Sequence, residues 1–302
     1  MKEENLKGKI IRAQSGFFAV ETRKGVITAK LRGRHTHGRQ ESDAAALGDV
    51  VHLTRYDDGS AVIEEIEERK NVLSRKAPGR DMEQVLVANL DQAVFVMSCA
   101  DPDPNFRMLD RFLVVAEREN IPAVICVNKL DLVVPRSARA EFGLYNALGY
   151  RVLYTSAKTG RGIRKLRKVL RSRLSVFAGP SGVGKSTLLN AVEPGLGLRT
   201  HHVRDKTRKG SHTTVVPELF ELSNGGLVAD TPGVKAFALW DIEPEEVDAY
   251  FPEMRDLVSS CEFSDCTHMH EPGCAVLDAL ETGDITPERY DSYCRIRLSD
   301  DE

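Results

Sequence analysis

The chain has 302 residues, enough for two domains or three small ones, and the composition of an ordinary globular protein. The net charge is only -3, but residues 241–302 hold 4 basic against 18 acidic residues, so the rest of the chain is basic and suited to a polyanion. No apolar run approaches the roughly 20 residues that span a bilayer, and the first residues lack a stretch of signal-peptide type. We therefore expect a cytoplasmic protein with no membrane association.

Residues 1–75 alternate short apolar stretches with glycines and charged turns. The stretches between Lys9 and Arg69 have the length of strands and no helical period, which predicts a small β-barrel. Five strands of this size are typical of an OB fold, whose usual ligands are oligonucleotides. We expect an RNA-binding domain here. The basic loop at 32–39 is explained equally well by a solvated turn and by a nucleic-acid contact.

The pattern changes after a linker expected near residues 76–80. Continuous apolar runs then alternate with stretches of helical period, which is typical of a parallel sheet with helices on both faces. The runs are 93–97, 123–127 and 152–154, and the helical stretches include 108–120 and 162–171. We assign residues 81–240 to this α/β domain. Cys99 and Cys126 lie on or beside the runs, where core packing is expected.

One segment of this domain, residues 161–173, carries seven basic residues and no acidic one. Its apolar residues recur at helical spacing, which predicts an amphipathic helix. A solvated helix face accounts for the charges, and contact with a nucleic acid is the alternative. The sequence leaves both interpretations open.

A phosphate-binding loop follows an apolar strand expected at 174–177. Residues 179–186 match GxxxxGK[ST] between a strand and a helix. In such a loop the backbone N–H groups cradle phosphates, the lysine bridges β and γ oxygens, and the hydroxyl binds Mg²⁺. We expect Lys185 to act in catalysis and Ser186 to ligate magnesium. The predicted contacts are Gly179, Pro180, Ser181, Gly182, Val183, Gly184, Lys185, Ser186 and Thr187.

Two further segments identify the base as guanine. They are Asn128-Lys129-Leu130-Asp131, after the run at 123–127, and Ser156-Ala157-Lys158, after the next strand. The Asp131 carboxylate can accept two hydrogen bonds, from guanine N1–H and N2–H₂, which adenine cannot donate. Asn128 is expected to brace the loop and Lys129 to cover the base. Ser156 and the Ala157 N–H are expected to complete the pocket around guanine O6.

The γ-phosphate and its metal have their own candidates. Asp230 ends an apolar strand, where an acidic residue can hold the water shell of Mg²⁺, and the Gly233 N–H can meet the γ-phosphate. A basic loop runs from residue 196 to 215, and loops of that length in compact domains are usually functional. Thr213 or Thr214 is the candidate that ligates Mg²⁺ only when the γ-phosphate is present.

Hydrolysis requires a group that positions the attacking water. Many GTPases place a glutamine directly after the DxxG glycine, but here that residue is Val234, which cannot orient water. His212, beside the two threonines, is the best local candidate for a catalytic role, and a structural or RNA-contacting role explains it as well. A partner could supply the group instead.

The C-terminal segment, residues 241–302, contains Cys261-x4-Cys266-x-His268-x5-Cys274. Three thiols and an imidazole form a tetrahedral set for one structural Zn²⁺, and a small acidic segment with few large apolar residues gains folding energy from such a site. The spacing is not that of a zinc finger. His270 is a second candidate for the imidazole, and Cys294 is not expected to be a ligand.

The order of the motifs is rotated, because the guanine segments precede the phosphate loop. Together with the barrel and the stretches 231–240 and 261–274, this order resembles the RsgA/YjeQ family of circularly permuted bacterial GTPases. The resemblance covers nearly the whole chain. It implies an N-terminal OB domain, a permuted α/β GTPase domain, and a small, mostly helical zinc-binding domain. In that permuted order the γ-phosphate segment would lead directly into the zinc domain.

The resemblance also implies a function. It predicts binding to the 30S ribosomal subunit through 16S rRNA, a role in late subunit maturation, and GTP hydrolysis that the subunit stimulates. We expect a monomer that cycles between GTP and GDP. The family's switch segment usually reads GRHTTT, whereas residues 210–215 read GSHTTV, so the identity of the magnesium threonine stays open. The alternatives are a GTP-regulated RNA-binding switch with negligible hydrolysis and an RNA-independent GTPase.

Overall fold

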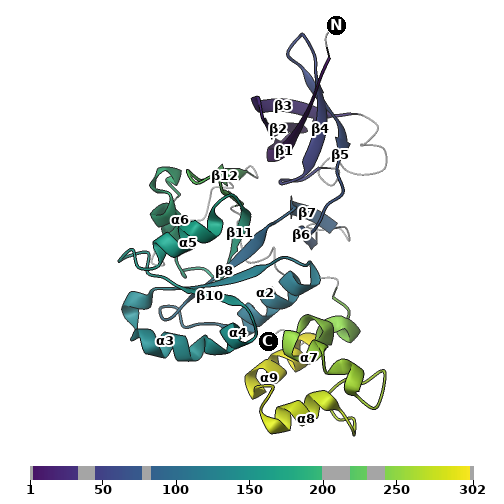
Figure 1. The fold of residues 1–302 in the computed structure, drawn as a ribbon, viewed down its shortest axis with the longest axis vertical. Helices are drawn as coiled ribbons and strands as arrows, with labels where there is room; N and C mark the ends of the chain where they lie inside the picture. The colour runs from purple at the N-terminus through teal and green to yellow at the C-terminus, as the bar shows by residue number, and fades with distance from the viewer. Residues whose placement is uncertain (1–2, 33–44, 77–82, 199–217, 230–241, 300–302) are drawn as a thin grey trace, which may run out of the picture.

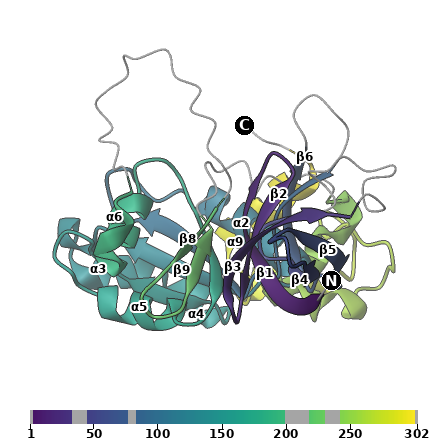
Figure 2. The same ribbon diagram turned by 90° about the horizontal axis from the view of Figure 1, so that it is seen from above.

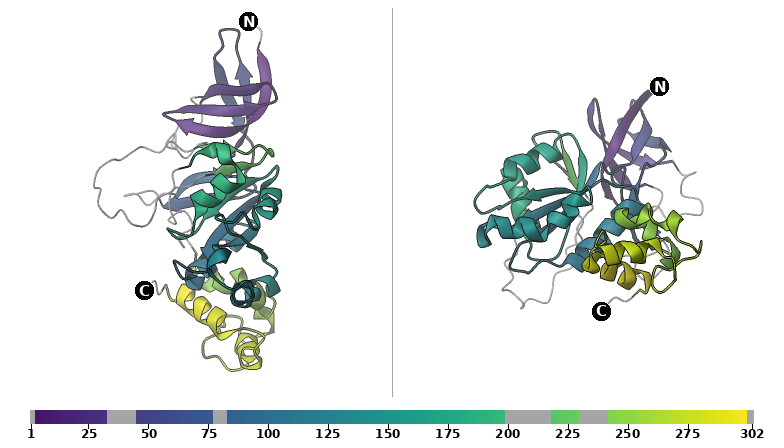
Figure 3. Two further views of the ribbon diagram at one scale, coloured as in Figure 1. Left: turned by 90° about the vertical axis from the view of Figure 1, so that its left-hand side faces the viewer. Right: turned by 60° about the horizontal axis from the view of Figure 1, so that its bottom comes forward.

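The computed structural model describes residues 3–32, 45–76, 83–198, 218–229 and 242–299. These residues form a barrel, an α/β domain and a helical C-terminal domain, which succeed one another along the longest axis of the molecule (Figures 1 and 3). None of the helices within them is both long and apolar enough to cross a membrane.

The N-terminal part is a closed five-stranded barrel with strand order β1-β2-β3-β5-β4. Its strands are β1 (Glu4–Gln14), β2 (Phe17–Thr22), β3 (Gly25–Leu31), β4 (Val50–Arg55) and β5 (Ala61–Ile66). Neighbouring strands are antiparallel except β3 and β5, which run parallel. Alternating residues such as Ile10, Val20 and Ile63 are fully buried inside, as strand geometry requires. The predicted OB-type barrel is confirmed.

A hairpin of β6 (Val72–Lys76) and β7 (Glu83–Ala88) connects the barrel to the α/β domain. The Ala88 N–H donates to the Leu47 carbonyl at 2.8 Å, so the barrel packs directly on this hairpin. Gly48 makes the approach possible, because its φ is +84° and an added Cβ would lie 2.1 Å from the Ala88 carbonyl oxygen. Strand β1 of the barrel also reaches the α/β domain through an ion pair between Arg12 and Glu218, the residue before β12.

The α/β domain contains a six-stranded sheet with order β10-β9-β8-β11-β13-β12. Its strands are β8 (Gln92–Ser98), β9 (Ala123–Asn128), β10 (Arg151–Tyr154), β11 (Leu174–Ala178), β12 (Leu219–Glu221) and β13 (Leu227–Ala229). All neighbours are parallel except the edge strand β12. The strand that carries the phosphate loop, β11, therefore lies in the middle of the sheet although it comes fourth along the chain. This is the arrangement expected of a GTPase sheet whose chain has been permuted.

Helices cover both faces of the sheet, as predicted, and alternate side chains of β8 determine the two layers. Phe95 and Met97 pack toward α2 (Phe106–Arg118), whereas Val94 and Val96 pack toward α5 (Ile163–Leu170) and α6 (Lys185–Val192). The short helices α3 (Pro135–Glu141) and α4 (Gly143–Ala147) contribute Ala138 and Tyr145 to the α2 layer. Cys99 and Cys126 are buried in the domain, as expected.

The C-terminal domain is built from short helices around its own core, in which Phe251, Met254, Val276 and Tyr293 are buried. They are η5 (Pro244–Tyr250), α7 (Pro252–Arg255), η6 (Val258–Ser260), α8 (Ala275–Thr282) and α9 (Pro287–Arg297). Val114 of α2 joins this core, so the domain packs on the α2 side of the sheet. Figure 2 shows the α/β domain on one side and the barrel and C-terminal helices on the other.

Candidate GTP-binding and metal sites

The three nucleotide motifs follow strands of one parallel set. Asn128 is the last residue of β9, Ser156 comes two residues after β10, and the phosphate loop follows β11 and ends where α6 begins at Lys185. Parallel strands present their carboxyl ends at one edge of a sheet, where ligands of such folds bind. The fold therefore brings the predicted base and phosphate segments together, although Asn128 and Gly184 are far apart in sequence.

The phosphate loop has the backbone that its glycines permit. Gly179, Gly182 and Gly184 have φ values of +148°, +82° and +93°, which residues other than glycine rarely adopt. An added Cβ on Gly179 would lie 2.1 Å from the Val96 carbonyl oxygen, and one on Gly184 would lie 2.6 Å from Asn128 Nδ2. The loop is thus packed against β8 and against the guanine segment. Alanine at either position would displace it.

Asn128, at the end of β9, hydrogen-bonds the segments that follow two other strands, β10 and β11. Its Nδ2 donates to the Val183 carbonyl at 2.9 Å, and its Oδ1 accepts from the Ala157 N–H at 3.2 Å and from Thr155 Oγ1 at 3.3 Å. The side chain is 2% exposed, so these bonds replace water that it cannot reach. Asn128 braces the phosphate loop and the Ser156 segment.

Ser156 contacts the carboxylate of Asp131. Its Oγ donates to Asp131 Oδ1 at 2.5 Å and accepts from the Thr159 N–H at 3.2 Å. The hydroxyl thus positions the exposed Asp131 carboxylate, and its place in the pocket around guanine O6 stays a prediction. Lys129 adopts the left-handed conformation, with φ of +62°, and its ammonium group donates to the Asp101 carbonyl.

Lys185 lies over its own loop. Its Nζ donates to the carbonyls of Gly179 at 2.7 Å and Pro180 at 2.8 Å. Ser186, the next residue, is partly buried in the first turn of α6, while Ser181, Thr187 and Lys158 are exposed. An ammonium group and a helix start at the end of a glycine-rich loop provide positive charge and N–H donors for a phosphate chain. The remaining predicted residues, His212, Thr213, Thr214, Asp230 and Gly233, lie outside the described residues.

The cysteine cluster of the C-terminal domain forms a compact set of donors. Cys261, Cys266, His268 and Cys274 place one ligand atom each within 4.8 Å of all the others. Cys261 Sγ lies 4.0 Å from Cys274 Sγ and 3.6 Å from His268 Nδ1, and the distance from His268 Nδ1 to Cys274 Sγ is 3.3 Å. Tetrahedral zinc with ordinary bond lengths would separate two sulfurs by about 3.8 Å and a sulfur from a nitrogen by about 3.6 Å. The donor set fits Zn²⁺.

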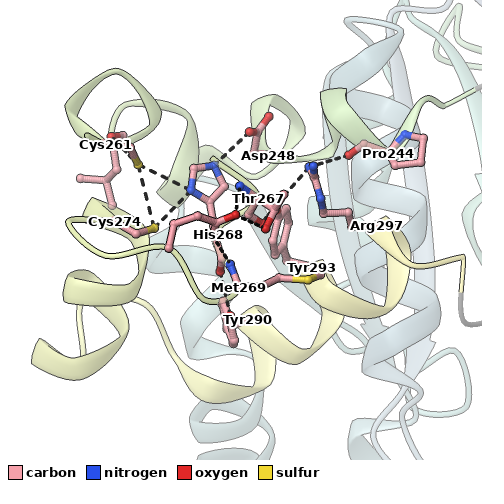
Figure 4. A network of polar contacts seen from close by, with 12 residues as sticks. Pro244, Asp248, Cys261, Thr267, His268, Met269, Cys274, Tyr290, Tyr293 and Arg297 are labelled. Carbon is pink, nitrogen blue, oxygen red and sulfur yellow. Dashed lines mark hydrogen bonds and ion pairs between the residues drawn. The ribbon is translucent and has the colours of Figure 1, made fainter. Parts of the chain in front are cut away.

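The surrounding structure fixes which histidine joins this cluster. His268 is fully buried with φ of +60°, and its Nε2 lies 3.1 Å from Asp248 Oδ2 (Figure 4). Hydroxyls of Tyr290 and Tyr293 donate to the carbonyls of His268 and Thr267, each at 2.8 Å. A carboxylate on the second ring nitrogen holds a metal-binding imidazole in the correct tautomer. His270 is exposed and outside the cluster, and the half-buried Cys294 is outside it as well, so the structure selects His268.

Two residues of these sites carry no signal in the sequence. Asp248 precedes the first cysteine by thirteen positions within an acidic stretch, and nothing in its neighbours marks it as the partner of His268. Thr155 is buried behind the guanine segment, where its hydroxyl bonds Asn128. Both act through side chains that only the folded chain brings within reach.

Comparisons with known proteins agree with this geometry. Residues 66–240 match the RsgA GTPase family and residues 7–63 match the RsgA N-terminal domain. The small ribosomal subunit biogenesis GTPase RsgA of Gemmatimonas aurantiaca is 46% identical over 294 residues, 96% of each chain. The protein of that name from Moorella thermoacetica is 44% identical over 292 residues, 95% of each chain.

Solved structures agree over the same length. The crystal structure of YjeQ from Thermotoga maritima superposes with a TM-score of 0.82 at 37% identity and covers 98% of both chains. YloQ, described as a circularly permuted GTPase, gives a TM-score of 0.77 at 35% identity, with 98% of this chain and 95% of that chain covered. The resemblance expected from the rotated motifs is confirmed, and this chain belongs to the RsgA GTPase family.

Proposed function

We propose that this chain is a GTPase of small ribosomal subunit biogenesis, which binds the 30S particle and hydrolyses GTP faster when bound, in late subunit maturation. Its family and the names of its relatives support this function. The observation in the chain itself that carries the proposal is the side chain of Asn128. It hydrogen-bonds the phosphate loop and the Ser156 segment, so one buried amide joins the parts that would bind guanine and phosphates.

The nucleotide contacts follow from this arrangement. The carboxylate of Asp131, held by Ser156, would accept from guanine N1–H and N2–H₂, and the Ala157 N–H would donate to O6. Lys129 and Lys158 would border the base. Gly179 to Thr187 would hold the phosphates, with Lys185 moving from its loop carbonyls onto phosphate oxygens. Gly233 would bind the γ-phosphate.

Magnesium and catalysis involve the residues on either side of this loop. The Ser186 hydroxyl would ligate Mg²⁺. Thr213 or Thr214 and Asp230 would be the other protein groups at the ion. The ion neutralises charge on the β- and γ-phosphates when bound. Since Val234 cannot orient water, we assign water positioning to His212 and stabilisation of phosphate charge to Lys185.

The other two domains would serve recognition. The N-terminal domain, residues 1–75, would contact 16S rRNA through its barrel, as the OB fold commonly binds oligonucleotides. The C-terminal domain, residues 241–302, would fold around one structural Zn²⁺ held by Cys261, Cys266, His268 and Cys274. The GTPase domain, residues 81–240, lies between them in sequence. We propose a monomer that works in the cytoplasm, where small subunits are assembled.

Phosphate release with and without isolated 30S subunits tests the function. We expect hydrolysis of GTP but not ATP, and a clear acceleration by subunits. No acceleration would favour the alternative, an RNA-binding switch with negligible hydrolysis. If the chain were an RNA-independent GTPase, it would hydrolyse GTP but show no salt-sensitive binding to the subunit.

Replacing Asp131 by asparagine tests the base site separately. Two hydrogen bonds to a carboxylate contribute about 1.5–3 kcal/mol each, so Asp131→Asn should weaken GTP binding by roughly 10²- to 10⁴-fold. Xanthine carries a carbonyl where guanine carries the amino group, and the asparagine amide can donate to it. Xanthosine triphosphate should therefore restore binding, which also shows that the variant is folded. Equal GTP binding by the variant would contradict the assignment.

A further inference from the structure

The basic helix α5 is exposed along the whole of its charged side. Arg161, Arg164, Lys165, Lys168 and Arg171 are all exposed, and none forms a hydrogen bond or ion pair through its side chain with a residue that the structure describes. Leu166, Val169 and Leu170 are buried on the opposite side, against the sheet. The charged side is therefore exposed, and the sequence left two interpretations of it open, a solvated face and a nucleic-acid contact.

The other two cations of the segment have structural roles. Arg167 donates through Nε to the Val192 carbonyl at 3.0 Å, and Arg173 donates through NH1 to Gln92 Oε1 at 3.1 Å. The first bond attaches α5 to α6, and the second attaches the residue before β11 to β8. Arg167 also helps to lower the pKa of the Glu193 carboxyl, after the larger effect of hydrogen bonds from Ser223. The five exposed cations are thus surplus to the packing of the helix.

The cations of the first turn oppose the stability of the helix, whereas Arg167 and Lys168 in its last turn agree with the helix dipole. Arg164 and Lys165 occupy its first turn, where the helix dipole favours acidic residues, and α5 has none there. Arg164 and Lys168 are four residues apart, so like charges face each other on one side of the helix. The chain as a whole has 45 acidic and 42 basic residues, so composition does not impose this choice. The unfavourable first-turn charges and the Arg164–Lys168 pair point to a function outside the helix.

We propose that the exposed side of α5 binds the phosphate backbone of RNA, as a second RNA contact besides the barrel. This inference rests on the proposed function and assigns part of the subunit interface to the GTPase domain. Arginine and lysine bind phosphates regardless of sequence. The helix spans about 12 Å, enough for several phosphates. Residues 161–173 contain no aromatic side chain on which an unpaired base could stack, which favours a double-helical RNA segment.

The position of α5 leaves this side available. It lies beside α6, on the face of the sheet opposite α2, whereas the C-terminal domain packs on α2 (Figure 1). The first residues of the basic segment also adjoin the guanine site, because the Ser156 N–H donates to the Arg161 carbonyl at 2.9 Å. RNA on α5 would thus lie close to the loop that reads the base.

The test compares two matched double variants of the full-length protein. Arg164→Gln with Lys168→Gln removes two cations from α5, and Arg136→Gln with Arg139→Gln removes two exposed cations from α3 on the other face. Glutamine has nearly the helix propensity of arginine and lysine, so both variants should fold, and the α5 variant should melt at the same or a higher temperature. Thermal melting is the folding control.

Binding to isolated small subunits and to deproteinised 16S rRNA is measured from 50 to 300 mM KCl. For the α5 variant we expect the slope of log K against log salt to fall by about 1 to 2, and binding at 100 mM salt to weaken by roughly tenfold or more. The α3 variant should match the wild type. Failure of the wild type to bind subunits would refute the proposed function itself.

Two outcomes with the α5 variant would refute the inference alone. One is wild-type binding with an unchanged salt slope in the α5 variant. The other is α5-dependent binding to vesicles of anionic phospholipid with no α5 dependence on RNA, which would assign the surface to a membrane. An equal loss in the α3 variant would also count against it, since the effect would then be one of net charge.

Discussion

Arg289 is the side chain whose loss should most change how the C-terminal domain is held. It is 1% exposed on α9 and lies between two carboxylates. Its NH1 donates to Asp110 Oδ1 of α2 at 2.6 Å, and its Nε and NH2 donate to the two oxygens of Glu253 on α7 at 2.6 and 3.2 Å. Its guanidinium carbon lies 4.4 Å from the centre of the Phe251 ring. One residue thus joins two elements of its own domain to the GTPase domain.

Arg289→Met removes the cation and leaves two buried carboxylates. Breaking a buried ion pair by removing one partner costs about 3–5 kcal/mol, mostly because the remaining charge is uncompensated. Asp110 keeps hydrogen bonds from Ser292 Oγ at 2.5 Å and Tyr145 OH at 2.8 Å, whereas Glu253 loses both bonds from the guanidinium. The destabilisation should therefore fall on the packing of α7 and α9 against α2.

Native-state hydrogen exchange measures this effect locally, which a single melting curve of a three-domain chain does not. An opening free energy lower by 3–5 kcal/mol corresponds to a loss of protection in α9 of roughly 10²- to 10⁴-fold. Barrel strands β1 to β5 should keep their protection. The triple variant Arg289→Met, Asp110→Asn, Glu253→Gln should recover much of the loss, because no uncompensated charge remains. Unchanged α9 protection in the single variant, or no recovery in the triple, would refute the reasoning.

Three further predictions concern the metal and catalytic residues. Removing zinc with a chelator should expose the thiols of Cys261, Cys266 and Cys274 to alkylation at pH 8. Cys99 and Cys126 should stay unmodified, because burial raises their pKa to about 11 and about 12. Mass spectrometry measures the modified cysteines, and the same pattern with and without chelator would contradict the zinc assignment. Asp248→Ala should weaken zinc binding by about 10- to 100-fold in competition with a chromogenic chelator, and equal affinity would exclude a role for the Asp248–His268 contact. His212→Ala should lower subunit-stimulated hydrolysis by about 10²- to 10⁴-fold without changing GTP affinity, and full activity would assign water positioning elsewhere.

Much of this protein could be predicted from local sequence. The glycines, lysine and serine of residues 179–186 are contiguous, and a backbone that must cradle phosphates needs those residue types at that spacing. Asn128 and Asp131 are equally close together after an apolar run. The sequence predicts the buried strands because a strand covered on both faces is a nearly continuous apolar run. In β8 this run extends from Ala93 to Met97. Composition and periodicity therefore sufficed for the fold class and the chemistry of the ligand.

The sequence determined which parts exist and in what order, and the tertiary structure decided which side chains meet. Asp110 and Arg289 are 179 positions apart, and Asp248 and His268 are 20 apart, with no pattern linking either pair. Ser156 faces Asp131 because β9 and β10 are parallel neighbours, a contact that neither segment encodes alone. His268 rather than His270 joins the cysteines because its ring is buried beside Asp248. Motifs are set by adjacent residues, whereas partners depend on distances that exist only once the chain is packed.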